Sequence, residues 1–220
     1  MPSAACKVVV LISGSGSNLQ ALINNIAAGE NPATVAAVIS NRSDAYGLQR
    51  AQAAGIATLV LDHKAFSDRA SFDQALTAAI DGFEPQLVVL AGFMRILSSE
   101  FVRHYQGRLL NIHPSLLPKY KGMHTHQRAI DNGEHEHGCS VHFVTEELDG
   151  GPLVVQAVVP IIAGDTAQSL AQRVRVEEHR IYPLAVSWFA QGRVSLSTQG
   201  ATFDGQLLAP SGKVLHALAG

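Results

Sequence analysis

Residues 7–23, KVVVLISGSGSNLQALI, join a short apolar run, a glycine-rich turn and the start of an amphipathic segment. The run Lys7–Ile12 is rich in β-branched residues and predicts a buried strand, whereas Asn18–Ala28 has the apolar spacing of a helix. A strand that passes through a glycine turn into a helix is the first half of a β–α–β unit. We therefore expect a parallel sheet whose first strand begins at Lys7.

The same alternation of strand and helix patterns continues to about residue 112. Strand-like runs cover Thr34–Ser40, Ala57–Leu61, Gln86–Ala91 and Arg108–Ile112, and helical patterns cover Ala45–Ala54, Asp68–Gly82 and Ser98–Tyr105. Because strands that alternate with helices connect through right-handed crossovers, we expect an α/β fold with a mostly parallel, twisted, doubly wound sheet and helices on both faces. In such a sheet ligands bind at the carboxyl ends of the strands.

The pattern changes after these strands. Prolines, glycines and four histidines in residues 114–138 indicate a mobile loop around one short helix. Two strand-like runs follow, Cys139–Thr145 and Pro152–Ile161. A long helix is expected over Thr166–Ala190, capped by Asp165, before an antiparallel C-terminal extension of short strands and a weakly structured tail. No linker divides the chain, so the sequence indicates a single domain.

The composition excludes several classes of protein. Apolar residues make up 47% of the 220 residues and charged residues 15%, and 16 basic against 18 acidic residues give a formal charge of −2. Binding to nucleic-acid phosphates needs a strong basic excess, so no nucleic-acid partner is expected. Cys6 and Cys139 are too few for a disulfide framework. The run Lys7–Ile12 is too short for a signal peptide or a membrane span, so we expect a cytoplasmic protein without a membrane partner.

The glycine-rich turn GSGSN, residues 14–18, is a candidate phosphate site. Glycines let the backbone approach an anion closely, and the free N–H groups at the start of a helix attract one. Leu19 replaces the third glycine of a dinucleotide fingerprint, and the lysine of a nucleotide P-loop is missing. A plain strand-to-helix turn capped by Ser17 or Asn18 is the alternative.

Asn111 and His113 stand together in NIHPSLLP at the end of a predicted strand. Since alternate residues of a strand point to the same side, both side chains reach the edge where ligands bind. A carboxamide N–H and an imidazole that supplies a proton or a charge form a credible pair for stabilising an oxyanion. Asp149 lies in a turn pattern, and beside His113 its carboxylate would favour the charged imidazole. Ordinary strand-end and turn roles remain open for all three residues.

Two further patterns allow either a function or a structural explanation. Four histidines alternate in the loop after residue 113: His124, His126, His135 and His137. No nearby cysteine or acidic residue completes a zinc-ligand spacing, so we favour a solvated, pH-sensitive loop over a metal site. Glu177 and Glu178 approach the apolar stripe of the long helix, where a substrate amine or a neighbouring basic side chain would pair with them.

Five runs between residues 11 and 185 resemble the phosphoribosylglycinamide formyltransferase family in order and spacing. They read GSGSNLQALI, LAGFMRILS, LLNIHPSLLPKYKG, GCSVHFVTEELDGGP and EEHRIYPLA. That family uses folate in purine synthesis, and the resemblance implies a Rossmann-like formyltransferase fold formed by a single domain over residues 1–220. Its nucleotide-binding half would cover about 1–105, and its folate-binding and catalytic half about 106–220.

The resemblance also implies roles for individual residues. Asn111, His113 and Asp149 match the family's catalytic residues. The phosphoribosylglycinamide site would consist of Gly14, Ser15, Gly16, Ser17, Asn18 and Glu178. The folate site would consist of Arg69, Met94, Arg95, Ile96, Leu97, Asn111, Thr145, Glu146, Glu147, Leu148 and Asp149. No metal is implied.

The implied reaction is direct attack of the glycinamide amine on the formyl group of the co-substrate 10-formyltetrahydrofolate. Asn111 and His113 would stabilise the oxyanion, assisted by Asp149. Formyltetrahydrofolate hydrolase, methionyl-tRNA formyltransferase, a non-catalytic folate- or nucleotide-binding module and a metal-dependent hydrolase are the alternatives. The first two typically carry a further regulatory or basic domain, for which this sequence gives no pattern. We expect small-molecule substrates only, and either a monomer or a homodimer.

Overall fold

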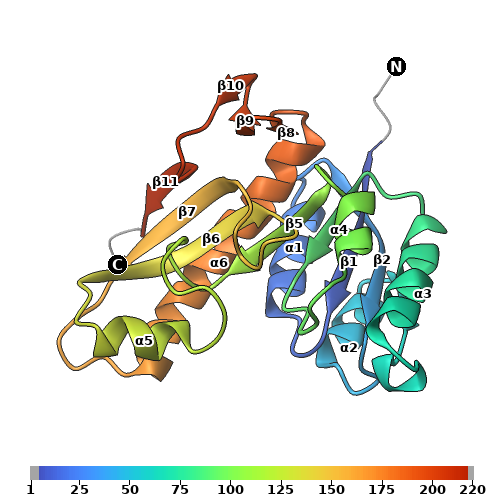
Figure 1. Ribbon diagram of the computed structural model, residues 1–220, viewed down its shortest axis with the longest axis horizontal. Helices are drawn as coiled ribbons and strands as arrows, with labels where there is room; N and C mark the ends of the chain where they lie inside the picture. Colours follow the sequence, from blue (N-terminus) through green and yellow to red (C-terminus); the bar gives the residue numbers. More distant parts are fainter. Residues whose placement is uncertain (1–4, 218–220) are drawn as a thin grey trace. The chain divides into compact units, whose positions relative to one another are not determined.

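The computed structural model describes residues 5–217 (Figure 1). The chain divides into two compact units, residues 1–110 and 111–220, and the boundary falls within β5 (Leu109–His113). The strands of the first unit are β1 (Cys6–Ile12), β2 (Ala33–Ser40), β3 (Ala57–Val60) and β4 (Leu87–Leu90). Its helices are α1 (Ser17–Ala27), α2 (Tyr46–Ala53), the 3-10 helix η1 (His63–Ala65), α3 (Arg69–Asp81) and α4 (Ser99–His104).

The first unit is a parallel sheet with a reversal of strand order beside β1. The order is β4-β1-β2-β3, and residues 8–12 of β1 are fully buried because both faces of the sheet are covered. Helix α1 packs on α2, and α3 packs on α4. Across the sheet, β2 and β3 follow β1 in one direction, whereas β4 lies on the opposite side of β1. Right-handed crossovers in these two directions put the α1–α2 pair and the α3–α4 pair on opposite faces of the sheet. The carboxyl ends of β1 and β4 therefore form a topological switch point.

The second unit combines antiparallel strands with one long helix. Its elements after β5 are α5 (Thr125–Asp131), β6 (Glu136–Phe143), β7 (Leu153–Pro160), α6 (Ala167–Ala190), β8 (Val194–Ser197), β9 (Gly200–Phe203), β10 (Gln206–Leu207) and β11 (Lys213–His216). The strand order is β11-β7-β6-β5, with β6 and β7 antiparallel and α6 packed on both. Strands β8, β9 and β10 form a separate antiparallel sheet.

The predicted α/β fold with a mostly parallel sheet and an antiparallel extension is confirmed, and two details are wrong. The tail is not weakly structured, because β11 pairs parallel with β7. Thr166, not Asp165, caps α6: its side chain accepts from the Ser169 N–H. Asp165 instead pairs with Arg173, a charged partner two turns along the helix. Among the described residues, no helix is both long enough and apolar enough to cross a membrane.

Candidate active site

Four polar side chains converge in the second unit near the end of β5. Asn111 Nδ2 lies 3.1 Å from His142 Nε2, which lies 4.0 Å from Asp149 Oδ1. Asp149 Oδ2 lies 3.5 Å from His113 Nδ1. The structure therefore brings together Asn111, His113 and Asp149, and it adds His142, which the sequence did not indicate.

The hydrogen bonds of His142 define its tautomer. Its ring is 2% exposed, and Nδ1 lies 2.9 Å from the Phe143 carbonyl oxygen. A carbonyl only accepts, so Nδ1 carries the hydrogen and Nε2 accepts from the Asn111 carboxamide. Burial lowers the pKa of His142 to about 4, and the ring is therefore neutral near pH 7. His142 thus fixes which end of the Asn111 carboxamide points toward it.

His113 is oriented by a backbone carbonyl on its opposite side. Its Nε2 lies 2.9 Å from the Tyr120 carbonyl oxygen, so this nitrogen donates and Nδ1 is the nitrogen that faces Asp149. The 3.5 Å separation from the carboxylate is longer than a good hydrogen bond. A protonated His113 therefore presents an Nδ1–H that a substrate oxygen can share with Asp149.

Asp149 occupies a left-handed position in the connection between β6 and β7. Its φ is +49°, a conformation that costs energy for a residue with a side chain. Gly122 N–H donates to Asp149 Oδ2 at 2.9 Å. Two residues on, a Cβ at Gly151 would collide with the Phe143 carbonyl oxygen, so the connection requires glycine there. The backbone on both sides therefore sets the position of the Asp149 carboxylate.

Polar side chains anchor the loop that follows β5. Ser140 Oγ donates to the Ser115 carbonyl at 2.6 Å and accepts from Leu117 N–H at 3.1 Å. Lys121 pairs with Glu147 at 2.6 Å and so joins the loop to the turn that carries the aspartate. The mobility expected of this loop stays a prediction.

Two of the loop histidines are less solvated than the sequence analysis predicts. His137 is 1% exposed, and its Nε2 lies 3.1 Å from Nδ1 of the half-buried His126. Burial lowers the pKa of both rings, that of His137 to about 4. The expectation is wrong for these residues because β6 begins at Glu136 and carries His137 into the core. Residues 5–217 contain no group of three or more His, Cys, Asp or Glu placed to hold a metal ion.

In the first unit, the glycine-rich turn lies at the switch point of the sheet. A cavity of about 180 Å³ is lined by residues 13–18 after β1 and by Ala91, Gly92 and Met94 after β4. Gly16 has φ +68°, and a Cβ there would lie 2.6 Å from Gly47 Cα, so a side chain is excluded. The N-cap of α1 is Gly16, so no side chain caps this helix. The alternative prediction, a cap by Ser17 or Asn18, is wrong.

The residues assigned to folate fall in both units and expose apolar side chains. Met94 and Ile96, in the irregular segment after β4, are 69% and 63% exposed, and Leu148 in the second unit is 56% exposed. The Arg95 guanidinium lies 5.6 Å from the centroid of the Phe72 ring. Arg69 is the exposed first residue of α3. Large apolar side chains on ordered loops are typical of a ligand-binding surface.

The two glutamates of α6 differ in their surroundings. Glu177 is 5% exposed and pairs with Arg180 at 2.5 Å, which explains its burial. Glu178 is half-buried. Burial of the Cys139 thiol, together with the negative charges of Glu178 and Glu177, raises the pKa of this thiol well above its usual value. A buried thiol of this kind is a poor nucleophile.

Residues 6–186 match the family described as formyl transferase. The chain belongs to this family. It is 58% identical over 205 residues to phosphoribosylglycinamide formyltransferase of Escherichia coli (strain K12), covering 93% of this chain and 97% of that protein. It is 46% identical over 194 residues to the human trifunctional purine biosynthetic protein adenosine-3, covering 88% of this chain and 19% of the human protein.

A solved structure agrees with the fold of this formyl transferase. Phosphoribosylglycinamide formyltransferase from Coxiella burnetii, in complex with CHES, superposes with a TM-score of 0.93 at 52% identity. The match covers 96% of this chain and 99% of that one. The similarity thus extends through nearly all of both chains.

Sequence patterns missed three groups at the site of this formyl transferase: the His142 ring, the Tyr120 carbonyl and the Gly122 N–H. Two of them are backbone groups, which no residue type can reveal. His142 lies in β6, where every residue from His137 to Phe143 is buried, so no alternation of buried and exposed residues marks it.

Proposed function

We propose that this chain transfers the formyl group of 10-formyltetrahydrofolate to the amine of N1-(5-phospho-D-ribosyl)glycinamide in purine synthesis. The convergence of Asn111, His113 and Asp149 carries the proposal. The Escherichia coli relative, 58% identical over nearly the whole of both chains, is a phosphoribosylglycinamide formyltransferase and supports the same substrates. Folate is a co-substrate in this reaction, which requires no metal.

The first step is attack of the neutral amine on the formyl carbon. The acceptor is itself a nucleophile, so no activated serine or cysteine is needed. Negative charge develops on the formyl oxygen as the C–N bond forms. Asn111 Nδ2 carries two hydrogens, and since His142 accepts one, the second is the donor for this oxygen. Protonated His113 donates its Nδ1–H to the same atom, and each donor contributes on the order of 10²–10³ in rate.

Asp149 would have two roles: it stabilises the positive charge of His113, and it accepts a proton from the acceptor amine. Its carboxylate stabilises the His113 imidazolium from 3.5 Å. Attack leaves the acceptor nitrogen with a proton to lose, and the folate nitrogen must gain one as its bond to the formyl carbon breaks. Asp149 accepts the first proton, and a proton returns to the folate nitrogen directly or through water.

The acceptor would be held by its phosphate and its amine. We assign the phosphate to the cavity at the carboxyl ends of β1 and β4, where Gly14–Asn18 lead into α1. The amides at the start of this helix, with its positive dipole end, suit an anion. Glu178 of α6 would orient the amine through a charge-assisted hydrogen bond.

The folate would be recognised by apolar contacts and by arginines. Its ring faces suit the exposed Met94, Ile96 and Leu148 side chains. Its carboxylates suit the guanidinium groups of Arg69 and Arg95. The backbone of Thr145–Asp149 would supply the remaining polar contacts.

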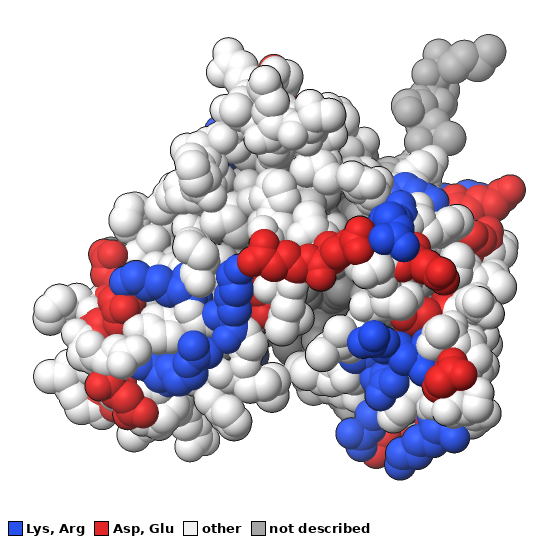
Figure 2. Space-filling view, viewed as in Figure 1, with Lys and Arg blue, Asp and Glu red and all other residues white. Residues whose placement is uncertain are grey.

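The chain would act as a single formyltransferase domain on small molecules in the cytoplasm. Cys6 and Cys139 are both unpaired, as is usual in a reducing compartment. Figure 2 shows acidic and basic side chains interleaved on the face drawn. Pairs such as Arg42 with Asp44, 2.7 Å apart, neutralise neighbouring charges.

Formyl transfer is tested with the purified chain and 10-formyltetrahydrofolate, with and without phosphoribosylglycinamide. We expect tetrahydrofolate and the formylated glycinamide, detected by mass spectrometry, only when the acceptor is present. Folate release at the same rate without acceptor would identify a hydrolase instead. Absence of turnover under both conditions would contradict the proposal.

A further inference from the structure

The segment Met94–Leu97 forms neither helix nor strand, although it presents apolar side chains to solvent. A flexible segment of this kind would lose conformational entropy on binding a ligand, and affinity would fall accordingly. A segment held in one conformation avoids that loss. The way its backbone is held therefore bears directly on ligand affinity.

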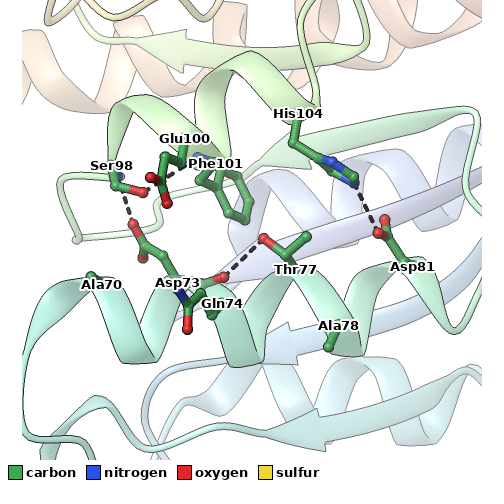
Figure 3. A pocket seen from close by; sticks show the side chains of 10 residues that line it. All are labelled: Ala70, Asp73, Gln74, Thr77, Ala78, Asp81, Ser98, Glu100, Phe101 and His104. Atoms are coloured by element: carbon green, nitrogen blue, oxygen red, sulfur yellow. Dashed lines mark hydrogen bonds and ion pairs between the residues drawn. The ribbon is translucent and has the colours of Figure 1, made fainter.

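Two buried side chains accept hydrogen bonds from the backbone at the two ends of this segment. Ser13 Oγ, at the end of β1, accepts from Met94 N–H at 2.8 Å. Asp73 Oδ2, in α3, accepts from Ser98 N–H at 2.6 Å, an interaction drawn in Figure 3. Ser13 is 6% exposed and Asp73 is 2% exposed. Both anchors are thus shielded from competing water.

The orientation of Ser13 is itself determined by a neighbour. Its hydroxyl donates to Asn41 Oδ1 at 2.6 Å, and Asn41 is 3% exposed. The amide nitrogen of the same carboxamide, Asn41 Nδ2, lies 3.2 Å from His63 Nδ1. Because the Ser13 hydrogen is committed to Asn41, the oxygen lone pairs are left for Met94 N–H.

Asp73 is placed at an energetic cost. Its Oδ1 is buried and has no hydrogen-bond partner among the described residues. A buried carboxylate with an unused oxygen is unfavourable, so the bond from Oδ2 to Ser98 N–H must offset that cost. The preceding residue, Phe72, also contacts the segment, because the Arg95 guanidinium lies over its ring. Helix α3 therefore holds the segment at two points.

We infer that Ser13 and Asp73 are positioning residues that hold Met94–Leu97 in the conformation that binds the folate co-substrate. The inference rests on the proposed function. It assigns the two residues no contact with the reacting atoms. Ser13 also lines the cavity beside the glycine-rich turn, so substrate selectivity is tested at Asp73. Loss of Asp73 should weaken binding of folate and not of phosphoribosylglycinamide, whereas a purely structural role would lower stability without distinguishing between the substrates.

The test compares three variants in steady-state formyl transfer. Asp73→Ala removes the acceptor, Asp73→Asn keeps one oxygen for Ser98 N–H, and Asp81→Asn is a matched control. Asp81 lies on the same helix and contacts His104 (Figure 3) and Tyr105 rather than the segment. We expect Asp73→Ala to raise KM for 10-formyltetrahydrofolate about 10- to 100-fold, with kcat within about threefold. KM for phosphoribosylglycinamide should stay within about twofold, and Asp73→Asn should restore most of the folate affinity.

Each outcome separates this inference from the proposed function. A wild-type chain without formyl transfer would contradict the proposed function. An active wild-type chain with unchanged folate KM in Asp73→Ala, or with equal increases in both KM values, would overturn the inference alone. If Asp73→Ala does not fold, Ser13→Ala decides, with an expected rise of about threefold to tenfold in folate KM and faster hydrogen exchange at Met94 N–H. Unchanged folate KM and exchange in Ser13→Ala would overturn it.

Discussion

Replacing Asn111 and His142 by alanine, singly and together, tests whether the histidine acts through the asparagine. Asn111 would donate one N–H to the developing oxyanion and the other to His142 Nε2, 3.1 Å away. Loss of an oxyanion donor costs on the order of 10²–10³ in kcat, about 3–4 kcal/mol. The bond to His142 joins two neutral groups and contributes about 1 kcal/mol. We therefore expect kcat to fall at least about 100-fold in Asn111→Ala and about fivefold in His142→Ala.

The double variant distinguishes a positioning role from an independent one. Once Asn111 is absent, His142 has no carboxamide to orient, so kcat of the double variant should lie within about twofold of Asn111→Ala. Rates are measured with both substrates saturating, and thermal unfolding shows that each variant is folded. His135→Ala, an exposed histidine outside the site, is the control. If the two losses instead multiply to about 500-fold, the reasoning about His142 is refuted.

Three further predictions follow from the same structure. Because burial lowers the pKa of His137 and His142 to about 4, below the ordinary value near 6.5, the unfolded chain binds protons that the folded chain does not. The free energy of unfolding should be constant between about pH 6.5 and 8 and fall as pH decreases toward 4, by up to about 2.7 kcal/mol per pH unit. A flat profile in urea unfolding would contradict this prediction. Gly16→Ala should destabilise the chain by at least about 1–2 kcal/mol and weaken phosphoribosylglycinamide binding, because φ is +68° and the new Cβ meets Gly47; unchanged melting and affinity would count against the turn geometry. Lys121→Ala should lower the free energy of unfolding by less than about 1 kcal/mol, because the Lys121 and Glu147 side chains are 35% and 70% exposed and solvent screens the pair. A loss of several kcal/mol in urea unfolding would contradict this expectation.

The alternation of apolar runs predicts the first unit well because each element there is defined by local pattern. The strand predicted at Lys7–Ile12 is observed as β1, one residue longer, and the turn after it leads into α1 as expected. Burial on both faces of a parallel sheet makes such strands continuous apolar runs. The pairing of β11 with β7 could not be predicted in this way, because β11 has four residues and its partner lies far away in sequence.

The candidate site also depends on both local and distant parts of the sequence. Asn111 and His113 could be paired from the alternation of one strand, whereas the turn pattern at Asp149 left a turn role and a role beside His113 both open until the resemblance implied the second. The cap of α6 was predicted one residue too early because Asp165 and Thr166 are both good caps, and Arg173 in the folded chain decides between them. The hydrogen bonds from the Gly122 N–H and to the Tyr120 carbonyl depend on loop conformation, which residue types alone do not specify.

The most direct test is formyl transfer by His113→Ala, measured with both substrates saturating and compared with His135→Ala. If an imidazolium at this position stabilises the oxyanion, kcat falls at least about 100-fold while melting temperature and affinity for phosphoribosylglycinamide stay close to those of the unmodified chain. A His113→Ala variant that transfers formyl groups within about threefold of the normal rate would show that His113 is not part of the chemistry.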